Sequence, residues 1–206
     1  ARLYELKNEL SRASDMYIQI ERLDKAAELT LRLGEKERAA LLYEQGEFFS
    51  EAAVLYEELH LYDRAASCFE SAGDSAKAGE LAAQLGDSIK AAELHLQSEN
   101  YAEAGKLFVE AGASERAVDA YEEALDDDIL TVQGSIELGA LYITTEKHDQ
   151  AIKLLQKVVT DDEYGGRAEH LLAEAFMQKG LFNLAIDHYK EAIKPNTEIT
   201  QEKIEI

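Results

Sequence analysis

The sequence predicts an all-α protein, a right-handed solenoid of short antiparallel helix hairpins, and three observations lead to this prediction. Ala, Leu, Glu and Lys dominate the chain, which contains a single Pro and no Trp, and this composition favours helix over sheet. An alanine recurs at every thirteenth position through the first half. In the second half a longer period, of thirty-four positions, replaces it. Fixed periods of this kind are typical of stacked helical repeats.

The first repeat keeps its thirteen-residue spacing without a slip, and we call its alanines the anchors. They are Ala13, Ala26, Ala39, Ala52, Ala65, Ala78, Ala91, Ala104 and Ala117. In most copies a small residue follows the anchor and an apolar residue stands three positions after it. In six copies an aromatic residue stands at the fourth position, namely Tyr17, Tyr43, Tyr56, Phe69, Phe108 and Tyr121. These spacings place the side chains on one helical face, which we interpret as core and not as a ligand site.

One continuous helix cannot accommodate this repeat, because at about 100° per residue each anchor would be rotated by roughly 220° from the last. The chain must therefore turn once in every copy. We predict that helices end at Gly34, Gly46, Gly73, Gly86 and Gly112. We expect the next helices to be capped by Ser50, Asp63, Ser75, Ser88 and Ser114. Helices of about ten residues are marginal alone, so each must pack against its neighbours.

Beyond Ala117 the step between equivalent positions alternates between a long and a short one. The positions concerned are Ala117, Leu138, Ala151, Leu172 and Ala185, and they predict two longer hairpins at about 131–160 and 166–194. We accordingly expect three segments. Residues 1–126 form the compressed solenoid of thirteen-residue repeats, and residues 127–194 form two full hairpins that continue it. Residues 195–206 are a tail, the start of a truncated helix, or a segment docked on the last hairpin.

The two longer hairpins resemble the tetratricopeptide repeat (TPR) family. The residues that carry the resemblance are Leu138-Gly139, Tyr142, Ala151, Leu155 and Val158 in the first hairpin, and Leu172-Ala173, Phe176, Gly180, Ala185, Tyr189 and Ala192 in the second. Ser135 and Glu169 stand where the family often has an aromatic residue, and its terminal proline is displaced to Pro195. The compressed half is similar to relatives of this family in bacterial scaffolds and in eukaryotic transport and vesicle-coat subunits.

Charge and cysteine content narrow the classes of partner and location. The chain has 21 basic and 42 acidic residues, and its formal net charge of −21 repels nucleic acid and anionic lipid. No apolar run is long enough for membrane insertion. Cys68 is the one cysteine, so no internal disulfide can form; we expect a buried, inert thiol and a cytoplasmic location.

The sequence offers no catalytic or cofactor motif, so we expect neither an enzyme nor a cofactor or metal site. The five histidines, His60, His95, His148, His170 and His188, lack the tight spacing of metal ligands. The acidic runs at 126–128 and 161–163 lack the alternating oxygen ligands of a calcium loop, and we interpret them as solvated joints between hairpins. The glycine pair at 165–166 is no phosphate-binding loop, because no lysine accompanies it.

The resemblance implies a protein-interaction scaffold whose concave surface binds a partner peptide, a helix or a small regulatory domain such as a small GTPase. Its register predicts partner-facing positions near the inner anchors: Arg32, Val54, Glu57, Glu80, Gln84, Lys106, Val109, Glu110, Ile136, Ala140, Ile143, Arg167, His170, Glu174 and Met177. These positions mix acidic and apolar side chains, which suits a basic or amphipathic protein or peptide. The alternative is a structural segment of a larger transport or coat assembly that self-associates through its ends.

Overall fold

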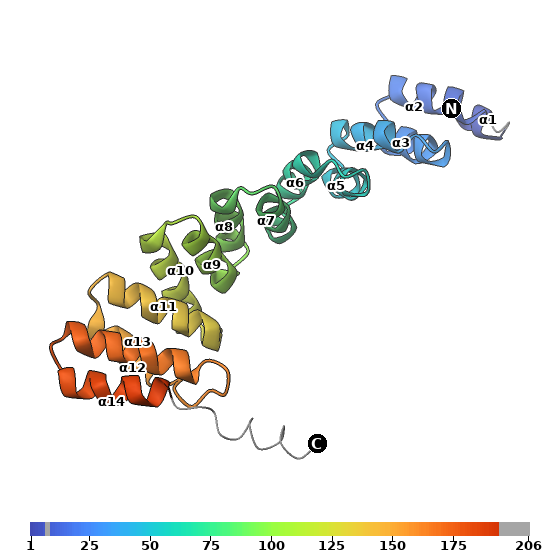
Figure 1. The fold of residues 1–206 in the computed structure, drawn as a ribbon. Helices are drawn as coiled ribbons and strands as arrows, with labels where there is room; N and C mark the ends of the chain where they lie inside the picture. Colours follow the sequence, from blue (N-terminus) through green and yellow to red (C-terminus); the bar gives the residue numbers. More distant parts are fainter. Residues whose placement is uncertain (7–8, 194–206) are drawn as a thin grey trace, which may run out of the picture. The chain divides into compact units, whose positions relative to one another are not determined.

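The computed structural model describes residues 1–6 and 9–193, and Figure 1 follows its helices along the chain. Every regular element within these residues is an α-helix, which confirms the predicted all-α class. The chain divides into two compact units, residues 1–100 and the residues from Tyr101 onward. Pro195 and the predicted segment 195–206 lie outside the described residues.

Unit 1 consists of a short first helix and seven helices of equal length. Their bounds are α1 Arg2–Leu6, α2 Leu10–Gln19, α3 Leu23–Arg32, α4 Lys36–Gln45, α5 Phe49–Glu58, α6 Tyr62–Ser71, α7 Ser75–Gln84 and α8 Ser88–Gln97. Within the unit each helix packs against the one before it and the one after it. The turn required in every copy of the repeat is therefore present, and each copy is one helix.

Unit 2 begins with another helix of this length, after which the helices vary. Their bounds are α9 Tyr101–Glu110, α10 Ser114–Asp126, α11 Val132–Thr144, α12 His148–Leu155, α13 Gly165–Gln178 and α14 Phe182–Ala192. The two predicted long hairpins correspond to α11 with α12 and to α13 with α14. The boundary predicted after residue 126 follows the repeat length and stays a prediction.

The turns between the short helices all pass through one residue in the left-handed backbone region. Positive φ angles recur with the period of the repeat, at Glu21, Gly34, Glu47, His60, Gly73, Gly86, Glu99 and Gly112. Gly46 ends α4 as predicted, but its own φ is −86° and the left-handed residue of that turn is Glu47. A side chain at Gly46 is excluded for another reason, because a Cβ atom there would lie 2.8 Å from the Phe48 ring.

The predicted N-caps are wrong by one or two positions. Ser75, Ser88 and Ser114 are the first residues of their helices, and Ser50 and Asp63 are second residues. The residue directly after the left-handed one occupies the cap position. At two turns this residue is an aspartate: Asp74 accepts a hydrogen bond from the Lys77 amide at 3.2 Å, and Asp87 accepts one from the Lys90 amide at 3.1 Å. The capping residue therefore follows the left-handed residue directly, whereas the predicted caps lie one or two positions further along the chain.

The core is made of the anchor alanines and the aromatic stripe. The nine anchors are fully buried, and Tyr56, Phe69, Phe108 and Tyr121 are buried as predicted, whereas Tyr17 and Tyr43 are half-buried. The expectation for Cys68 is also confirmed: the residue is 3% exposed, and burial raises the pKa of its thiol. Small anchors allow close approach of the helices, and the large rings fill the remaining space.

Unit 2 has an additional contact that fixes the arrangement of its helices. Helix α11 packs against α9 and α13, and also against α10 and α12. Helices α9, α11 and α13 are therefore neighbours in one layer, which we call the odd layer. Two glycines allow close packing between consecutive helices instead: a Cβ at Gly105 of α9 would lie 2.7 Å from the Tyr121 ring of α10, and one at Gly139 of α11 would lie 2.6 Å from Leu155 of α12.

Candidate functional site

The odd layer of unit 2 carries ten of the fifteen predicted partner-facing positions. Lys106, Val109 and Glu110 lie exposed on α9, and Val109 is 39% exposed. Ala140 is half-buried on α11. Because α11 lies between α9 and α13, side chains from all three helices can contribute to one surface.

The prediction is wrong for two positions of α11. Ile136 is 0% exposed and Ile143 is 4% exposed, so both side chains belong to the core and cannot contact a partner. Helix α11 contacts four other helices, and this leaves only a narrow stripe of its surface uncovered. That stripe consists of Gln133, Glu137, Ala140 and Thr144, at the three- and four-residue spacing of one helical face. Glu137 and Thr144 each lie one residue after a predicted position, Ile136 and Ile143, whereas Gln133 lies outside the positions that the register selected.

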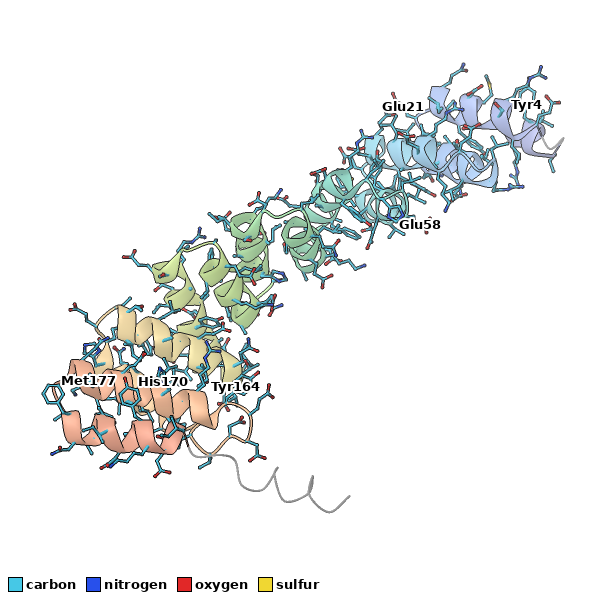
Figure 2. The ribbon with its side chains drawn as sticks, in the orientation of Figure 1. Tyr4, Glu21, Glu58, Tyr164, His170 and Met177 are labelled. Carbon is cyan, nitrogen blue, oxygen red and sulfur yellow. The ribbon has the colours of Figure 1, made fainter. Side chains whose placement is uncertain are left out.

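Helix α13 presents the remaining four predicted positions along one face. Arg167, His170 and Met177 are exposed and Glu174 is half-buried; His170 and Met177 are labelled in Figure 2. Nε2 of His170 lies 3.2 Å from Oε1 of Glu174, and the His170 ring stands edge-on to Tyr189 with 5.4 Å between centroids. The thioether of Met177, 41% exposed, adds an adaptable apolar contact at one end of this face.

In unit 1 the predicted positions all lie on the odd-numbered helices. Arg32 lies at the end of α3. Val54 and Glu57 share α5, and Glu80 and Gln84 share α7. Val54 is 45% exposed and is flanked on its helix by Glu51 and Glu57, so α5 displays an apolar side chain between carboxylates.

A regular set of basic residues was missed, although the sequence contains its signal. The position before the anchor is basic in seven of the nine copies: Arg12, Lys25, Arg38, Arg64, Lys77, Lys90 and Arg116. Three of these cations lie over the aromatic ring of the preceding repeat, Arg64 at 4.8 Å from the Tyr56 centroid, Lys77 at 4.9 Å from Phe69 and Arg116 at 4.2 Å from Phe108. The constant spacing from aromatic residue to cation could have revealed them.

The same cations also pair with carboxylates of other helices. Arg38 lies 3.2 Å from Asp15, Arg64 lies 3.6 Å from Glu44, and Lys90 lies 3.0 Å from Glu70. Such exposed pairs contribute little stability, about 0–1 kcal/mol each. These ion pairs matter more for recognition than for stability. They engage much of the positive charge in contacts within the fold, so the surface that faces solvent keeps an excess of negative charge.

Three buried tyrosines are held by carboxylates of a neighbouring helix. The hydroxyl of Tyr56 donates to Glu44 at 2.5 Å, that of Tyr121 donates to Glu137, and that of Tyr142 donates to Glu122 at 2.9 Å. Burial, and then these hydrogen bonds, raise the pKa of all three phenols. Glu137 also accepts from Gln133 at 2.9 Å, so the exposed stripe of α11 is tied to the core through Tyr121.

One surface pocket of about 260 Å³ lies in the odd layer. Its lining residues come from α9, α10, α11 and the residue that caps α11, and are Ala102, Glu103, Lys106, Tyr121, Thr131, Gln133, Gly134 and Glu137. Lys106 donates to Glu103 at 3.1 Å, and Glu103 raises the pKa of that lysine. The pocket thus holds two carboxylates and one cation, and Gln133 and Glu137 of the exposed α11 stripe form part of its lining.

His188 and Asp161, from the histidines and the acidic runs, are engaged in other contacts. Among the described residues no group of three or more His, Cys, Asp or Glu side chains could hold a metal ion. Nδ1 of His188 lies 2.6 Å from Glu169, and the His188 ring stacks on Phe176 at 5.1 Å. Asp161 accepts from the backbone amides of Glu163 and Tyr164 at 3.0 and 2.8 Å. None of the helices in the described part of the chain is long and apolar enough to cross a membrane.

The sequence matches no protein-family model and no curated protein sequence. Solved structures show a similar fold. A structure of MamA has 20% sequence identity and a TM-score of 0.58, and the match covers 77% of this chain and 94% of that protein. The C-terminal part of a TPR repeat-containing protein from Cytophaga hutchinsonii has 19% identity and a TM-score of 0.54, with 89% of this chain and 78% of that one covered. Together with the repeating helices, this likeness shows that the chain has a TPR-like α-solenoid fold.

Proposed function

We propose that this chain is a protein-interaction scaffold whose odd layer binds a basic or amphipathic protein segment. The observation that supports the proposal is the surface of α9, α11 and α13, where exposed apolar side chains alternate with carboxylates. Val109 stands beside Glu110, and Met177 follows Glu174 on the same helical face. An amphipathic segment would bury its apolar side chains there and set its cations against these acids.

The acidic positions are suited to this role because charge complementarity selects partners and accelerates their encounter. With a formal net charge of −21, the chain repels acidic ligands and attracts basic ones over a distance of about 8–10 Å at ordinary ionic strength. A short peptide, a helix of a larger protein and a small regulatory domain such as a small GTPase are all partners of this kind. The predicted positions of α3, α5 and α7 are proposed as a second surface of the same chemistry in unit 1.

The test is a selection of phage-displayed peptides on the full chain, followed by affinity measurements with the selected peptides. We expect enrichment of Lys and Arg together with Leu or Phe. The double variant Glu110→Lys/Glu174→Lys should weaken binding at least about tenfold. The matched control, Asp119→Lys/Glu123→Lys, makes the same charge change at exposed positions of α10 and should change affinity much less. Equal losses in both variants would show a general charge effect and contradict a site on the odd layer.

A further inference from the structure

Two lysines of unit 2 differ from the other lysines in the described part of the chain. Seven of those others form an ion pair with a carboxylate, and Lys77 lies over the Phe69 ring. Lys153 on α12 and Lys157 just after its end form neither contact with any described residue. In a chain with 42 acidic and 21 basic residues, a lysine without a carboxylate partner is an exception that requires a reason.

Both lysines line one surface pocket of about 190 Å³ where α10, α11 and α12 meet, which we call the lysine pocket. The other lining residues are Leu125, Tyr142, Gln150 and Leu154. The lining therefore contains two cations and no carboxylate. The pocket of the odd layer has the opposite balance, with two carboxylates and one cation.

The lysine pocket is separate from the exposed stripe of α11 in the odd layer. Helix α11 contributes Tyr142 to the pocket, and Tyr142 stands two positions after Ala140 of the stripe. At about 100° per residue, these two side chains point to nearly opposite sides of the helix. The surface proposed to bind a basic segment and the lysine pocket therefore lie on different sides of α11.

Two carboxylates lie near the lysine pocket, but neither pairs with its lysines. Glu122 accepts hydrogen bonds from the Tyr142 hydroxyl at 2.9 Å and from Lys147 at 3.3 Å. Lys147 also lies over the Tyr142 ring, 5.4 Å from its centroid. Burial, Glu122 and Asp126 together raise the pKa of the Tyr142 phenol, so Asp126 is also close. These contacts hold the Tyr142 ring as a wall of the pocket and leave its two ammonium groups available.

The lining determines which class of ligand fits. Two ammonium groups attract a carboxylate, and the side-chain amide of Gln150 is a further donor. Leu125, Leu154 and the Tyr142 ring supply apolar surface beside them. The volume lies below the roughly 300–1,000 Å³ of ordinary small-molecule sites and suits single side chains of a protein segment. Nucleic acid and anionic lipid are disfavoured by the net charge of −21.

We propose that the lysine pocket binds an acidic residue of a partner protein segment, with an apolar residue beside it. Lys153 and Lys157 bind the carboxylate, and the apolar side chain packs against Leu125 and the Tyr142 ring. The net charge of the chain repels such a segment at long range, so binding depends on the contacts within the pocket. The inference goes beyond the proposed function, because the odd layer is proposed to bind a basic segment, and either site can exist without the other.

The experiment is a selection of phage-displayed peptides on the full chain, from a library without Lys and Arg, which excludes the ligands proposed for the odd layer. We expect enrichment of Asp or Glu next to Leu or Phe. Lys153→Glu/Lys157→Glu should weaken binding of the selected peptides at least about tenfold. The matched control, Lys36→Glu/Lys190→Glu, makes the same charge change at two other exposed lysines and should weaken it less than about twofold.

An exchange of charge tests the contact itself. A peptide whose acidic residue is replaced by Lys should lose its binding to the parent chain and bind to Lys153→Glu/Lys157→Glu instead. Lys153→Arg/Lys157→Arg keeps both cations and should retain the acidic peptide. Replacement of the apolar residue of the peptide by Ser should weaken binding about threefold to tenfold. Melting curves of all variants provide the check that the fold is intact.

Four results would overturn the proposal. The first is a selection without acidic peptides, and the second is an equal loss of affinity in the pocket variant and the control. The third is displacement of the peptide by inorganic phosphate at equal concentration, which would indicate a general anion site. The fourth is a dimer in light scattering that Lys153→Glu/Lys157→Glu dissociates, because the occupant would then be a second copy of this chain.

Discussion

At the scale of single residues, the turns of unit 1 depend on one left-handed position that the sequence fills in two ways. Gly34, Gly73 and Gly86 occupy it without steric cost, because they have no Cβ. Glu21, Glu47, His60 and Glu99 occupy the same position with φ angles between 57° and 62°, where an L-residue loses roughly 1 kcal/mol. Four turns therefore carry strain that glycine would remove.

We expect Glu47→Gly to stabilise the protein by about 0.5–1 kcal/mol, because the relief of strain exceeds the entropy that glycine adds to the unfolded chain. The midpoint of urea unfolding measures the change, and Glu47→Gln separates the effect of the lost charge. Gly86→Ala should have the opposite sign, since its φ is +84° although no atom lies within 4 Å of the added Cβ. A lower midpoint for Glu47→Gly would show that the left-handed turn is not strained.

Gly105 illustrates a glycine required by packing. Gly105→Ala gains roughly 1 kcal/mol of helix propensity, but its Cβ would lie 2.7 Å from the ring of Tyr121, which is 1% exposed and cannot move away. Overpacking of this kind costs about 1–3 kcal/mol, so we expect net destabilisation in thermal unfolding. In a Tyr121→Ala background the same substitution should no longer destabilise, and a persistent loss there would exclude the ring as the cause.

At the scale of the element, each short helix begins close after its left-handed residue, and this determines which side chain can cap it. Asp74 and Asp87 stand at the cap position and accept backbone hydrogen bonds, whereas the serines that follow them are already helical. A sequence pattern of Gly-Asp-Ser contains two good capping residues. Only the backbone geometry distinguishes them.

We expect Asp87→Ala to destabilise the protein by about 1 kcal/mol, because the Lys90 amide loses its acceptor. The neighbouring change Ser88→Ala is the control and should lower stability much less. Thermal unfolding of the two variants and the parent chain under identical conditions provides the measurement. If Ser88→Ala has the larger effect, Ser88 and not Asp87 is the cap of α8.

The tyrosine–glutamate contacts between helices predict a loss of stability at alkaline pH. The pKa values of Tyr56, Tyr121 and Tyr142 are raised above the ordinary value of 10.0 by burial and by their carboxylate partners. Their contribution is fully present below pH 10 and is lost as the pH rises toward the folded pKa, because the unfolded chain releases these protons first.

Each of these tyrosines should account for about 1 kcal/mol of the stability lost between pH 9 and pH 11. The free energy of unfolding in urea at the two pH values measures it. A variant with Phe at all three positions should lose correspondingly less over this interval. An equal loss in the variant and the parent would mean that these phenols ionise at their ordinary pKa in the folded protein.

At the scale of the whole molecule, the acidic surplus opposes folding. The 21 basic residues can neutralise at most half of the 42 acidic ones, so the folded chain concentrates unbalanced negative charge. We expect the melting temperature to rise by a few degrees between about 10 and 150 mM NaCl, because salt screens this repulsion. Equimolar changes with a neutral osmolyte control for solvation. A falling melting temperature would show that the exposed ion pairs outweigh the repulsion.

The sequence by itself determined the helical class, the turn in every repeat, the buried anchors and the aromatic stripe, because burial repeats with the covalent spacing of the chain. It also predicted most of the exposed positions of the candidate surface, such as Met177 and Glu110. It missed Gln133 and Glu137 and misplaced Ile136 and Ile143. The helices that pack against α11 determine which of its faces stays exposed, and a local sequence pattern does not contain this information.

The tertiary structure alone decided the contacts made between helices. It tied Tyr121 to Glu137 and selected Asp87 over Ser88 as a cap. Each of these contacts depends on the distance between groups that are separated along the chain or that point in different directions. Periodicity fixes which face of a helix is apolar, whereas the neighbours that pack around the helix decide which part of that face remains accessible.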